Sequence, residues 1–448
     1  MIRPQAISGP PSPIAALFIW VVVVITSSGC TSLRRIIDFK DQASQARATS
    51  RIEGRIETEG PLQGNLVVIL GRLVDGQEKA VGIDSYVRVN PGSYAFSVAP
   101  GRFQVGAYED RNRNGLLDPD ERAARVRDSE ILEVGPGERA SLDIRLAVGA
   151  TLDELTEPLD VLALVERTPE EQREFSLWAF SAQGKICEDL GDEKFGPASG
   201  PRGLWEPMNF LNDELAGIYF LEAYDPDRVP VLFVHGIAGY PQEFSTLIEG
   251  LDRERFQAWF YFYPSGFGLD GISNHLEGLL KRMQVKHHFN RLAIVAHSMG
   301  GLVSRGAILK YEDDTRRDDI RLFISISTPW GGDLSAKGTE TARIELPASF
   351  KDMNPSSDYL RWIFYKDEKR ESLRTLPKRV DYHMIMGFRM SSAKRVADDS
   401  SVTLASQARI EAQEEAQTIR AWDYDHWDIL KSPEATARMN LLLNRRFE

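Results

Sequence analysis

The stretch that decides the fold runs from Arg291 to Arg305 and reads RLAIVAHSMGGLVSR. Its first half, Leu292 to Ala296, is a continuous apolar run typical of a buried strand, and it stops at His-Ser-Met-Gly-Gly. A second apolar pattern, with helical spacing, begins at Leu302. The stretch therefore predicts a strand, a sharp turn and a helix, with Ser298 at the apex of the turn.

A serine at such an apex has the surroundings that a nucleophile needs. A serine hydroxyl attacks poorly until a neighbouring base takes its proton and backbone N–H groups stabilise the developing oxyanion. A tight strand-to-helix turn exposes the hydroxyl but strains the backbone, so the residues two before and two after it must be small. These residues are Ala296 and Gly300. The pattern favours a nucleophilic Ser298, and a chance junction of strand and helix is the alternative.

The same residues resemble the nucleophile elbow of the α/β-hydrolase superfamily, and within it the bacterial lipases and esterases. The usual motif is G-x-S-x-G, and this chain has Ala296 in place of the first glycine. The resemblance covers about Val229 to Leu443. It implies an α/β-hydrolase fold, which is a mostly parallel, doubly wound sheet, and a Ser-His-Asp triad that cleaves carboxylic esters without a cofactor.

An apolar run from Pro230 ends at His235-Gly236, as expected for a parallel strand that is buried on both faces. The resemblance places one oxyanion-hole N–H on the residue after this pair, Ile237. It places the other on Met299, directly after the nucleophile. A tight strand-to-helix turn without a catalytic role is the alternative for the His-Gly pair.

The resemblance also implies that the acid and then the histidine follow the nucleophile along the chain. His383 falls in an apolar, strand-like run, whereas His426 lies after a predicted strand, in a loop of the kind where α/β sites are built. We therefore predict His426 as the general base and Asp399 as the acid that orients it. Asp398 stays a competitor, because Ser400 replaces the glycine of the family's D-G-x-V segment.

Two further features bear on the substrate and the reaction. A long excursion from Trp330 to Pro377 contains the apolar run Leu360 to Tyr365, which suggests a lid or a wall for an acyl chain, or else packed surface structure. The expected substrate is an acyl ester or lipid. Because the same site serves all acyl transfers, a thioesterase, amidase or acyltransferase is an alternative, as is a non-catalytic envelope protein that binds or scaffolds partners.

The N-terminal residues 1–30 read as a targeting segment. An apolar stretch, Ile14 to Ile25, ends in Ser28-Gly29-Cys30 and resembles a bacterial lipoprotein signal, in which Cys30 becomes lipidated. A plain secretory peptide or an uncleaved anchor is the alternative. Residues 31–50 are polar and predict a tether or short helix. The expected location is the bacterial cell envelope, lipid-anchored to a membrane on the periplasmic or outer-membrane side.

Residues 51–148 contain short strand-like segments separated by Pro-Gly turns, which predicts a small β-sandwich ahead of the hydrolase domain, residues 149–448. One loop matches D-x-[DN]-x-[DN]-G with a carboxylate at the twelfth position, and it resembles a calcium loop. A solvated acidic turn is the alternative. The candidate calcium ligands are Asp110, Asn112, Asn114, Leu116, Asp118 and Glu121.

Length and charge set the outer bounds of the interpretation. The chain has 448 residues, enough for two or three domains with a sizeable core. A net charge of −12 argues against nucleic acid as a partner, and against an anionic membrane surface bound by charge alone. The membrane contact that we expect is therefore the lipid anchor.

Overall fold

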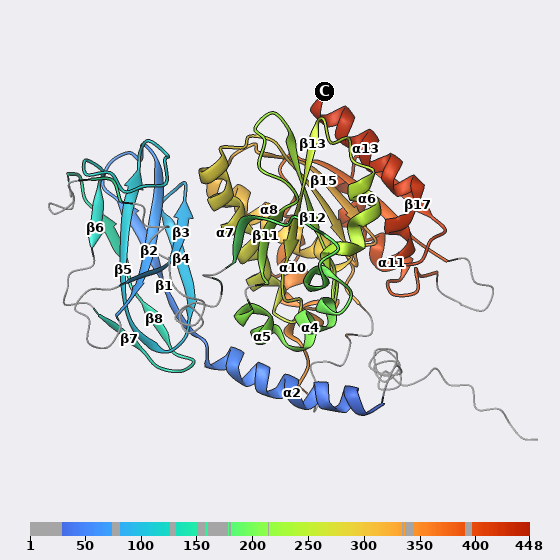
Figure 1. Ribbon diagram of the computed structural model, residues 1–448, viewed down its shortest axis with the longest axis horizontal. Coiled ribbons are helices and arrows are strands. Elements are labelled where there is room, and N and C mark those ends of the chain that lie inside the picture. Colours follow the sequence, from blue (N-terminus) through green and yellow to red (C-terminus); the bar gives the residue numbers. More distant parts are fainter. Residues whose placement is uncertain are drawn as a thin grey trace, which may run out of the picture.

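The computed structural model describes residues 29–73, 81–125, 131–149, 157–159, 178, 181–213, 215–333, 336, 345–389 and 397–448. Residues 1–28 of the predicted signal segment lie outside the described residues. The described part of the chain forms an N-terminal helix, a β domain and a larger α/β domain, which Figure 1 shows side by side. None of its helices combines the length and the apolar character that crossing a membrane requires.

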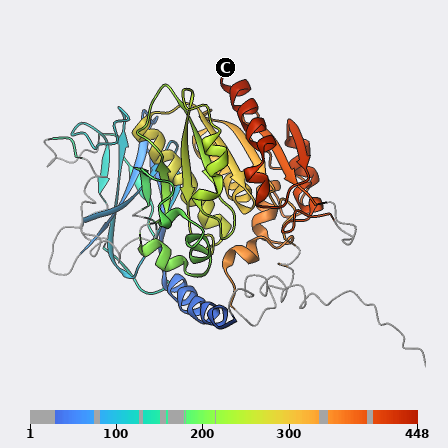
Figure 2. The ribbon, with the colours of Figure 1, turned by 45° about the vertical axis from the view of Figure 1, so that its right-hand side comes forward.

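The N-terminal helix α2 (Gly29–Ala48) occupies the segment for which a tether or short helix was predicted. Figures 1 and 2 show it, in dark blue, running along the α/β domain before the chain enters the β domain. Helix α2 therefore begins one residue before Cys30.

The β domain consists of two packed sheets, which confirms the predicted sandwich. One sheet has the order β4-β1-β8 with β9 also paired to β1, and the other has the order β3-β2-β5-β6 with β7 paired to β5. Residues such as Ile52, Val68 and Phe103 are buried in one cluster with side chains of both sheets. The strands are β1 (Ser50–Thr58), β2 (Asn65–Arg72), β3 (Val81–Arg88), β4 (Gly92–Val98), β5 (Gly101–Asp110), β6 (Ala123–Arg125), β7 (Leu132–Val134), β8 (Arg139–Ser141) and β9 (Ile144–Leu146).

The α/β domain is built on an eight-stranded sheet with the order β10-β11-β13-β12-β14-β15-β16-β17. Only the β11–β13 pair is antiparallel, and all other pairs are parallel. Every residue of β12, β13 and β14 is buried, which explains their predominantly apolar sequences. The strands are β10 (Ala182–Ile186), β11 (Gly217–Phe220), β12 (Val229–Val234), β13 (Phe256–Phe262), β14 (Leu292–His297), β15 (Ile320–Ile326), β16 (Asp381–Gly387) and β17 (Thr418–Trp422).

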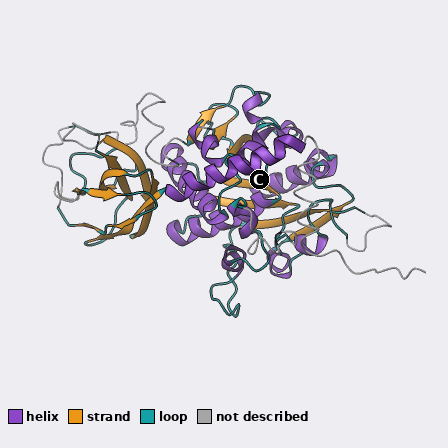
Figure 3. Cartoon of the chain, turned by 90° about the horizontal axis from the view of Figure 1, so that it is seen from below, coloured by secondary structure: helices purple, strands orange, loops and turns teal. Residues whose placement is uncertain are grey.

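Helices cover both faces of this sheet, as Figure 3 shows. Apolar side chains of α7, α8 and α10 pack on one face, and those of α6 and α13 pack on the other. This doubly wound arrangement is the α/β-hydrolase fold that the elbow predicted. The helices are α4 (Ser199–Trp205), α5 (Pro207–Asn212), α6 (Ser245–Glu249), α7 (Leu269–His287), α8 (Met299–Thr315), α9 (Ala348–Asp352), α10 (Asp358–Phe364), α11 (Leu404–Gln407), α12 (Ile410–Glu415) and α13 (Pro433–Phe447), with short 3-10 turns η2 (Glu193–Phe195), η3 (Pro241–Phe244) and η6 (Asp428–Lys431).

The apolar run, for which a lid, an acyl wall or packed surface structure was predicted, forms helix α10 and packs in the core of the α/β domain. Leu360, Ile363 and Phe364 of α10 are fully buried against α8. Buried Arg305 of α8 donates to the Ile363 carbonyl at 2.8 Å and pairs with Glu415, so α10 is fixed by polar contacts as well. Trp362 of the same helix and Tyr365, directly after it, are partly buried against this core. Residues 334–335 and 337–344 of the excursion lie outside the described part.

The two domains meet where β3 lies against α7. Lys281 is buried there between the carboxylates of Glu277 at 2.7 Å and Asp314 at 2.8 Å. Its ammonium also sits 4.4 Å from the centre of the Tyr86 ring, and Arg88 of β3 pairs with Asp314. A buried cation shared between two anions and a ring tolerates little displacement, so this cluster fixes how β3 lies on α7.

Candidate active site

Ser298 sits between β14 and α8 with φ 54° and ψ −130°, a conformation that side-chain-bearing residues rarely adopt. Close packing around it explains the small residues of the motif. A Cβ atom on Gly300 would lie 2.4 Å from two backbone carbonyl oxygens, and one on Gly236 would lie 2.7 Å from the Cβ of Ser298. Ala296 is completely buried in the core, so alanine is accommodated at the first position.

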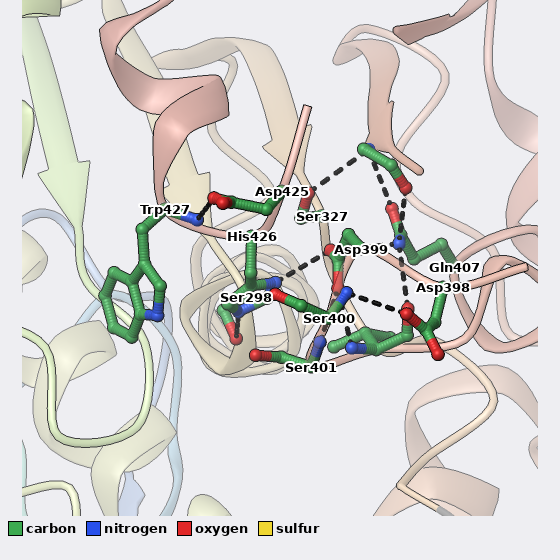
Figure 4. Close-up of polar contacts among 12 residues, drawn as sticks. Ser298, Ser327, Asp398, Asp399, Ser400, Ser401, Gln407, Asp425, His426 and Trp427 are labelled. Carbon is green, nitrogen blue, oxygen red and sulfur yellow. Dashed lines mark hydrogen bonds and ion pairs between the residues drawn. The ribbon is translucent and has the colours of Figure 1, made fainter. Parts of the chain in front are cut away.

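Three of the predicted residues come together at this turn (Figure 4). The Ser298 hydroxyl donates to His426 Nε2 at 2.9 Å, and His426 Nδ1 donates to Asp399 Oδ2 at 2.8 Å. The exposed fractions are 5% for Ser298, 3% for His426 and 0% for Asp399. His383, the other histidine considered, instead lies in β16 and contacts Thr418. The arrangement can move a proton from serine to histidine while a carboxylate holds the ring.

The structure separates the two adjacent aspartates. Asp399 faces His426, whereas Asp398 Oδ1 accepts the backbone N–H of Ser400 at 2.9 Å. Ser400 has φ 80°, in the left-handed region that favours glycine, which gives a physical reason for the glycine in the D-G-x-V segment. Asp425, close to His426 in sequence, caps the following turn and pairs with Arg389.

Asp399 is held by several donors in a buried setting. Its Oδ1 accepts the backbone N–H groups of Val402 at 2.6 Å and Ser401 at 3.1 Å, and Gln407 Nε2 donates to Oδ2 at 3.1 Å. Burial opposes the charged form, but the hydrogen bond and charge of His426 and these N–H donors outweigh it and lower the pKa of Asp399. The carboxylate is therefore ionised. Gln407, on α11, is a residue that sequence reasoning missed, because no motif marks it.

Burial lowers the pKa of His426 below its ordinary value of 6.5, although the hydrogen bond from its ring to Asp399 acts in the opposite direction. The imidazole is therefore neutral at pH 7, and its Nε2 is free of a proton. Neutral imidazole is the form that accepts a proton from a serine hydroxyl.

His297, directly before the elbow serine, is a second histidine that the sequence reasoning passed over. Its Nε2 donates to the main-chain carbonyl of His426 at 2.8 Å, and its Nδ1 lies 3.3 Å from Glu243 Oε1. The indole of Trp427 lies across both rings, 5.4 Å from His297 and 5.6 Å from His426. His297 therefore ties the loop that carries His426 to the end of β14, directly before Ser298.

The N–H groups predicted to form the oxyanion hole, those of Ile237 and Met299, lie on backbone segments that neighbouring contacts hold in place. Met299 is the first residue of α8, where an N–H has no acceptor inside the helix, and no acceptor is found among the described residues for the N–H of Met299 or Ile237. Residues 235–239, called the oxyanion loop below, are fixed by His235, which stacks on Tyr263 at 4.1 Å. Burial lowers the pKa of His235 to about 4, so its ring is neutral.

The candidate calcium loop follows β5 in the β domain. Both carboxylate oxygens of Asp110 accept backbone N–H groups, and so do those of Glu121. The side chains of Asn112 and Asn114 both donate to Asp118 Oδ2. Within the described residues, no group of three or more His, Cys, Asp or Glu side chains is arranged to hold a metal ion.

The fold and the geometry around Ser298 define a serine hydrolase of the α/β-hydrolase class. Residues 230–343 match the model of a family described as "Putative serine esterase (DUF676)". This segment contains the oxyanion loop and the elbow. The chain is thus an ester hydrolase of the serine-esterase type, as the sequence predicted. No curated protein matches it.

Solved structures that resemble the chain include lipases. The lin2722 gene product of Listeria innocua is 16% identical, with a TM-score of 0.36, over 49% of this chain and 95% of its own. The mature Bacillus licheniformis lipase BlEst2 is 16% identical, with a TM-score of 0.38, over 50% and 94%. Aspergillus fumigatus lipase B is 17% identical, with a TM-score of 0.38, over 51% and 56%.

The lowered pKa of His426 predicts the acidic limb of the pH profile. The proposed reaction requires the neutral ring, so the midpoint of the decline in kcat/KM at low pH, where His426 becomes protonated, should lie below 6.5. Steady-state kinetics on a soluble ester across this range measure the midpoint. A midpoint at or above 6.5 would contradict the assignment, and Asp398→Asn should leave the limb where it is.

Proposed function

We propose that the protein cleaves carboxylic esters with Ser298 as nucleophile, His426 as general base and Asp399 as the orienting acid. The observation that carries the proposal is the continuous hydrogen-bonded chain from the Ser298 hydroxyl through His426 to Asp399, at 2.9 and 2.8 Å. In the first step Ser298 Oγ bonds to the acyl carbon, and its proton passes to His426 Nε2. The same proton then goes to the leaving alcohol, which departs and leaves an acyl-serine.

A water molecule then hydrolyses the acyl-serine and restores the enzyme. His426 takes a proton from water, the hydroxide attacks the acyl-serine, and the proton returns to Ser298 as the acid leaves. In both steps a negative oxygen forms on the acyl carbon. The N–H groups of Ile237 and Met299 stabilise it, because they lie on fixed backbone beside the nucleophile.

The substrate that we propose is an acyl or lipid ester. The matched family is described as a serine esterase, and the geometry around Ser298 suits any acyl transfer. A thioester or amide substrate, or transfer to an acceptor other than water, would use the same residues. A purely scaffolding role is less well supported, because a buried, ionised carboxylate behind a neutral histidine serves no evident structural purpose.

We also propose that Cys30 carries a lipid and anchors the protein in the bacterial envelope, on the periplasmic or outer-membrane side. The support is the Ser28-Gly29-Cys30 sequence after an apolar stretch. The other cysteine, Cys187, is buried in the α/β domain and is unpaired. Lipidation of Cys30 would hold α2 next to the membrane surface.

We further propose that the loop of residues 110–121 binds calcium. Its donor set is all oxygen, with a glycine at the bend, as calcium loops require. Burial raises the pKa values of Asp110 and Glu121, and the nearby carboxylates raise them further. A bound cation would relieve this repulsion. Binding would also replace the contacts that Asn112 and Asn114 make with Asp118.

Substitution of the three proposed catalytic residues tests the reaction. Ser298→Ala and His426→Ala should each lower kcat by about 10⁴-fold or more, and Asp399→Asn by about 10³- to 10⁴-fold. Hydrolysis of a short-chain nitrophenyl ester and labelling by a fluorophosphonate measure these losses. Ser298→Ala should abolish labelling.

The neighbouring residues supply matched controls. Asp398→Asn and His383→Ala should leave kcat within a few-fold of the wild type, because neither side chain contacts Ser298 or His426. If a well-folded wild type is neither labelled nor active on esters, thioesters or amides, the scaffolding role replaces the enzymatic one.

Added calcium should raise the melting temperature of the full chain, because a ligand that binds only the folded state stabilises it. Calorimetry with calcium and then with a chelator measures the shift. Asp110→Asn combined with Glu121→Gln should remove it. An equal melting temperature with and without calcium in the wild type would exclude the site.

Cys30→Ala should release the protein from the membrane fraction. Cell fractionation, together with incorporation of a labelled fatty acid, measures the anchor. Cys187→Ala is the control, and it should keep both the lipid and the location. A labelled Cys30→Ala protein would show that the lipid is attached elsewhere.

A further inference from the structure

One face of helix α2 is buried against the α/β domain beside the oxyanion loop. Phe39 and Gln42 are three residues apart, which places them on the same side of the helix, and they are 3% and 6% exposed. The ring of Phe39 meets that of Trp205 on α4 edge to face, with centroids 5.8 Å apart. The same apolar cluster includes Ile237 and Ala238 of the oxyanion loop.

Gln42 makes a second, polar attachment to the α/β domain. Its Oε1 accepts the backbone N–H groups of Met208 at 3.0 Å and Asn209 at 3.1 Å. These N–H groups belong to the first turn of α5, where the side chain of the cap residue Glu206 accepts no backbone N–H. Helix α2 therefore supplies the cap that α5 lacks, and α5 follows α4 directly along the chain.

Helix α4 in turn touches the oxyanion loop through its backbone. A Cβ atom on Gly200 would lie 2.0 Å from the Ala238 carbonyl oxygen, so only glycine permits this approach. Ala238 has φ 49°, and its N–H donates to Ser265 Oγ at 3.0 Å. The next residue, Gly266, donates to the Gly203 carbonyl of α4 at 3.1 Å. The strained turn at Ala238 is thus in contact with Gly200 of α4 and bonded to Ser265. Helix α4 also accepts the N–H of Gly266, the residue after Ser265.

We propose that helix α2 is a positioning element of the active site. Phe39 and Gln42 hold α4 and α5 in place, and α4 holds the strained oxyanion loop so that the Ile237 N–H stays aimed at the developing oxyanion. Neither side chain touches the reacting atoms. The inference rests on the proposed hydrolytic function and adds that residues outside the matched family segment set its rate.

This role has a consequence for a tethered enzyme. Helix α2 starts one residue before the proposed anchor at Cys30, so the part of the chain nearest the membrane also supports the catalytic loop. Any pull or contact that lifts α2 from α4 would loosen the Ile237 N–H and slow the reaction. Removing residues up to 48 to obtain a soluble enzyme would do the same.

Kinetics on point variants in the otherwise intact chain test the proposal. Phe39→Ala and Gln42→Leu should lower kcat for a short nitrophenyl ester by about tenfold or more with KM within about twofold, because the oxyanion N–H acts on the transition state. Affinity for a trifluoromethyl ketone, which forms an oxyanion on Ser298, should fall by about the same factor. Gln42→Glu should keep kcat, because a carboxylate accepts the same two N–H bonds.

Controls separate this role from general destabilisation. Lys40→Ala, on the exposed face of α2, should match the wild type in every measurement. If Phe39→Ala and Gln42→Leu remain folded by circular dichroism, with unchanged kcat and ketone affinity, α2 has no positioning role although the esterase stands. Activity that survives in Ser298→Ala would overturn the proposed function, and the role of α2 with it.

Discussion

The structure depends on one strained backbone position. Ser298 has a positive φ and little space around it, because Gly236 and Gly300 let the backbone of Val234 to Gly236 lie directly against the turn. Such a conformation costs about 1–3 kcal/mol and persists only where the surroundings enforce it. A completely buried strand on one side and helix α8, packed on the sheet, on the other provide that enforcement. The rest of the α/β domain can be understood as the frame that holds this turn.

The polar groups around the turn form a second frame. Asp399 is fixed by backbone N–H groups and Gln407, and it fixes the ring of His426. His297 holds the main chain at His426 through a hydrogen bond to its carbonyl oxygen. Because these contacts are buried, the protonation states of Asp399 and His426 are set by their surroundings. A serine hydrolase needs this combination of an ionised acid and a neutral base at pH 7.

The β domain and helix α2 make specific contacts with the α/β domain. The β domain meets α7 around buried Lys281, and helix α2 meets α4 and α5 through Phe39 and Gln42. Buried charged and capped contacts of this kind fix orientation more than they add stability. The β domain and helix α2 therefore each have a defined place against the α/β domain.

The sequence by itself predicted the elbow, the buried strands beside it and the sandwich, because these follow from local periodicity and from residues adjacent in the chain. It also predicted His426, through the residue order that the family resemblance implies and its place in a loop after a strand. It could not separate Asp398 from Asp399, since neighbouring side chains differ only in the direction that the loop backbone gives them. It also missed Gln407 and the buried face of α2. These act through contacts between distant segments, and only the packed tertiary structure brings such segments together.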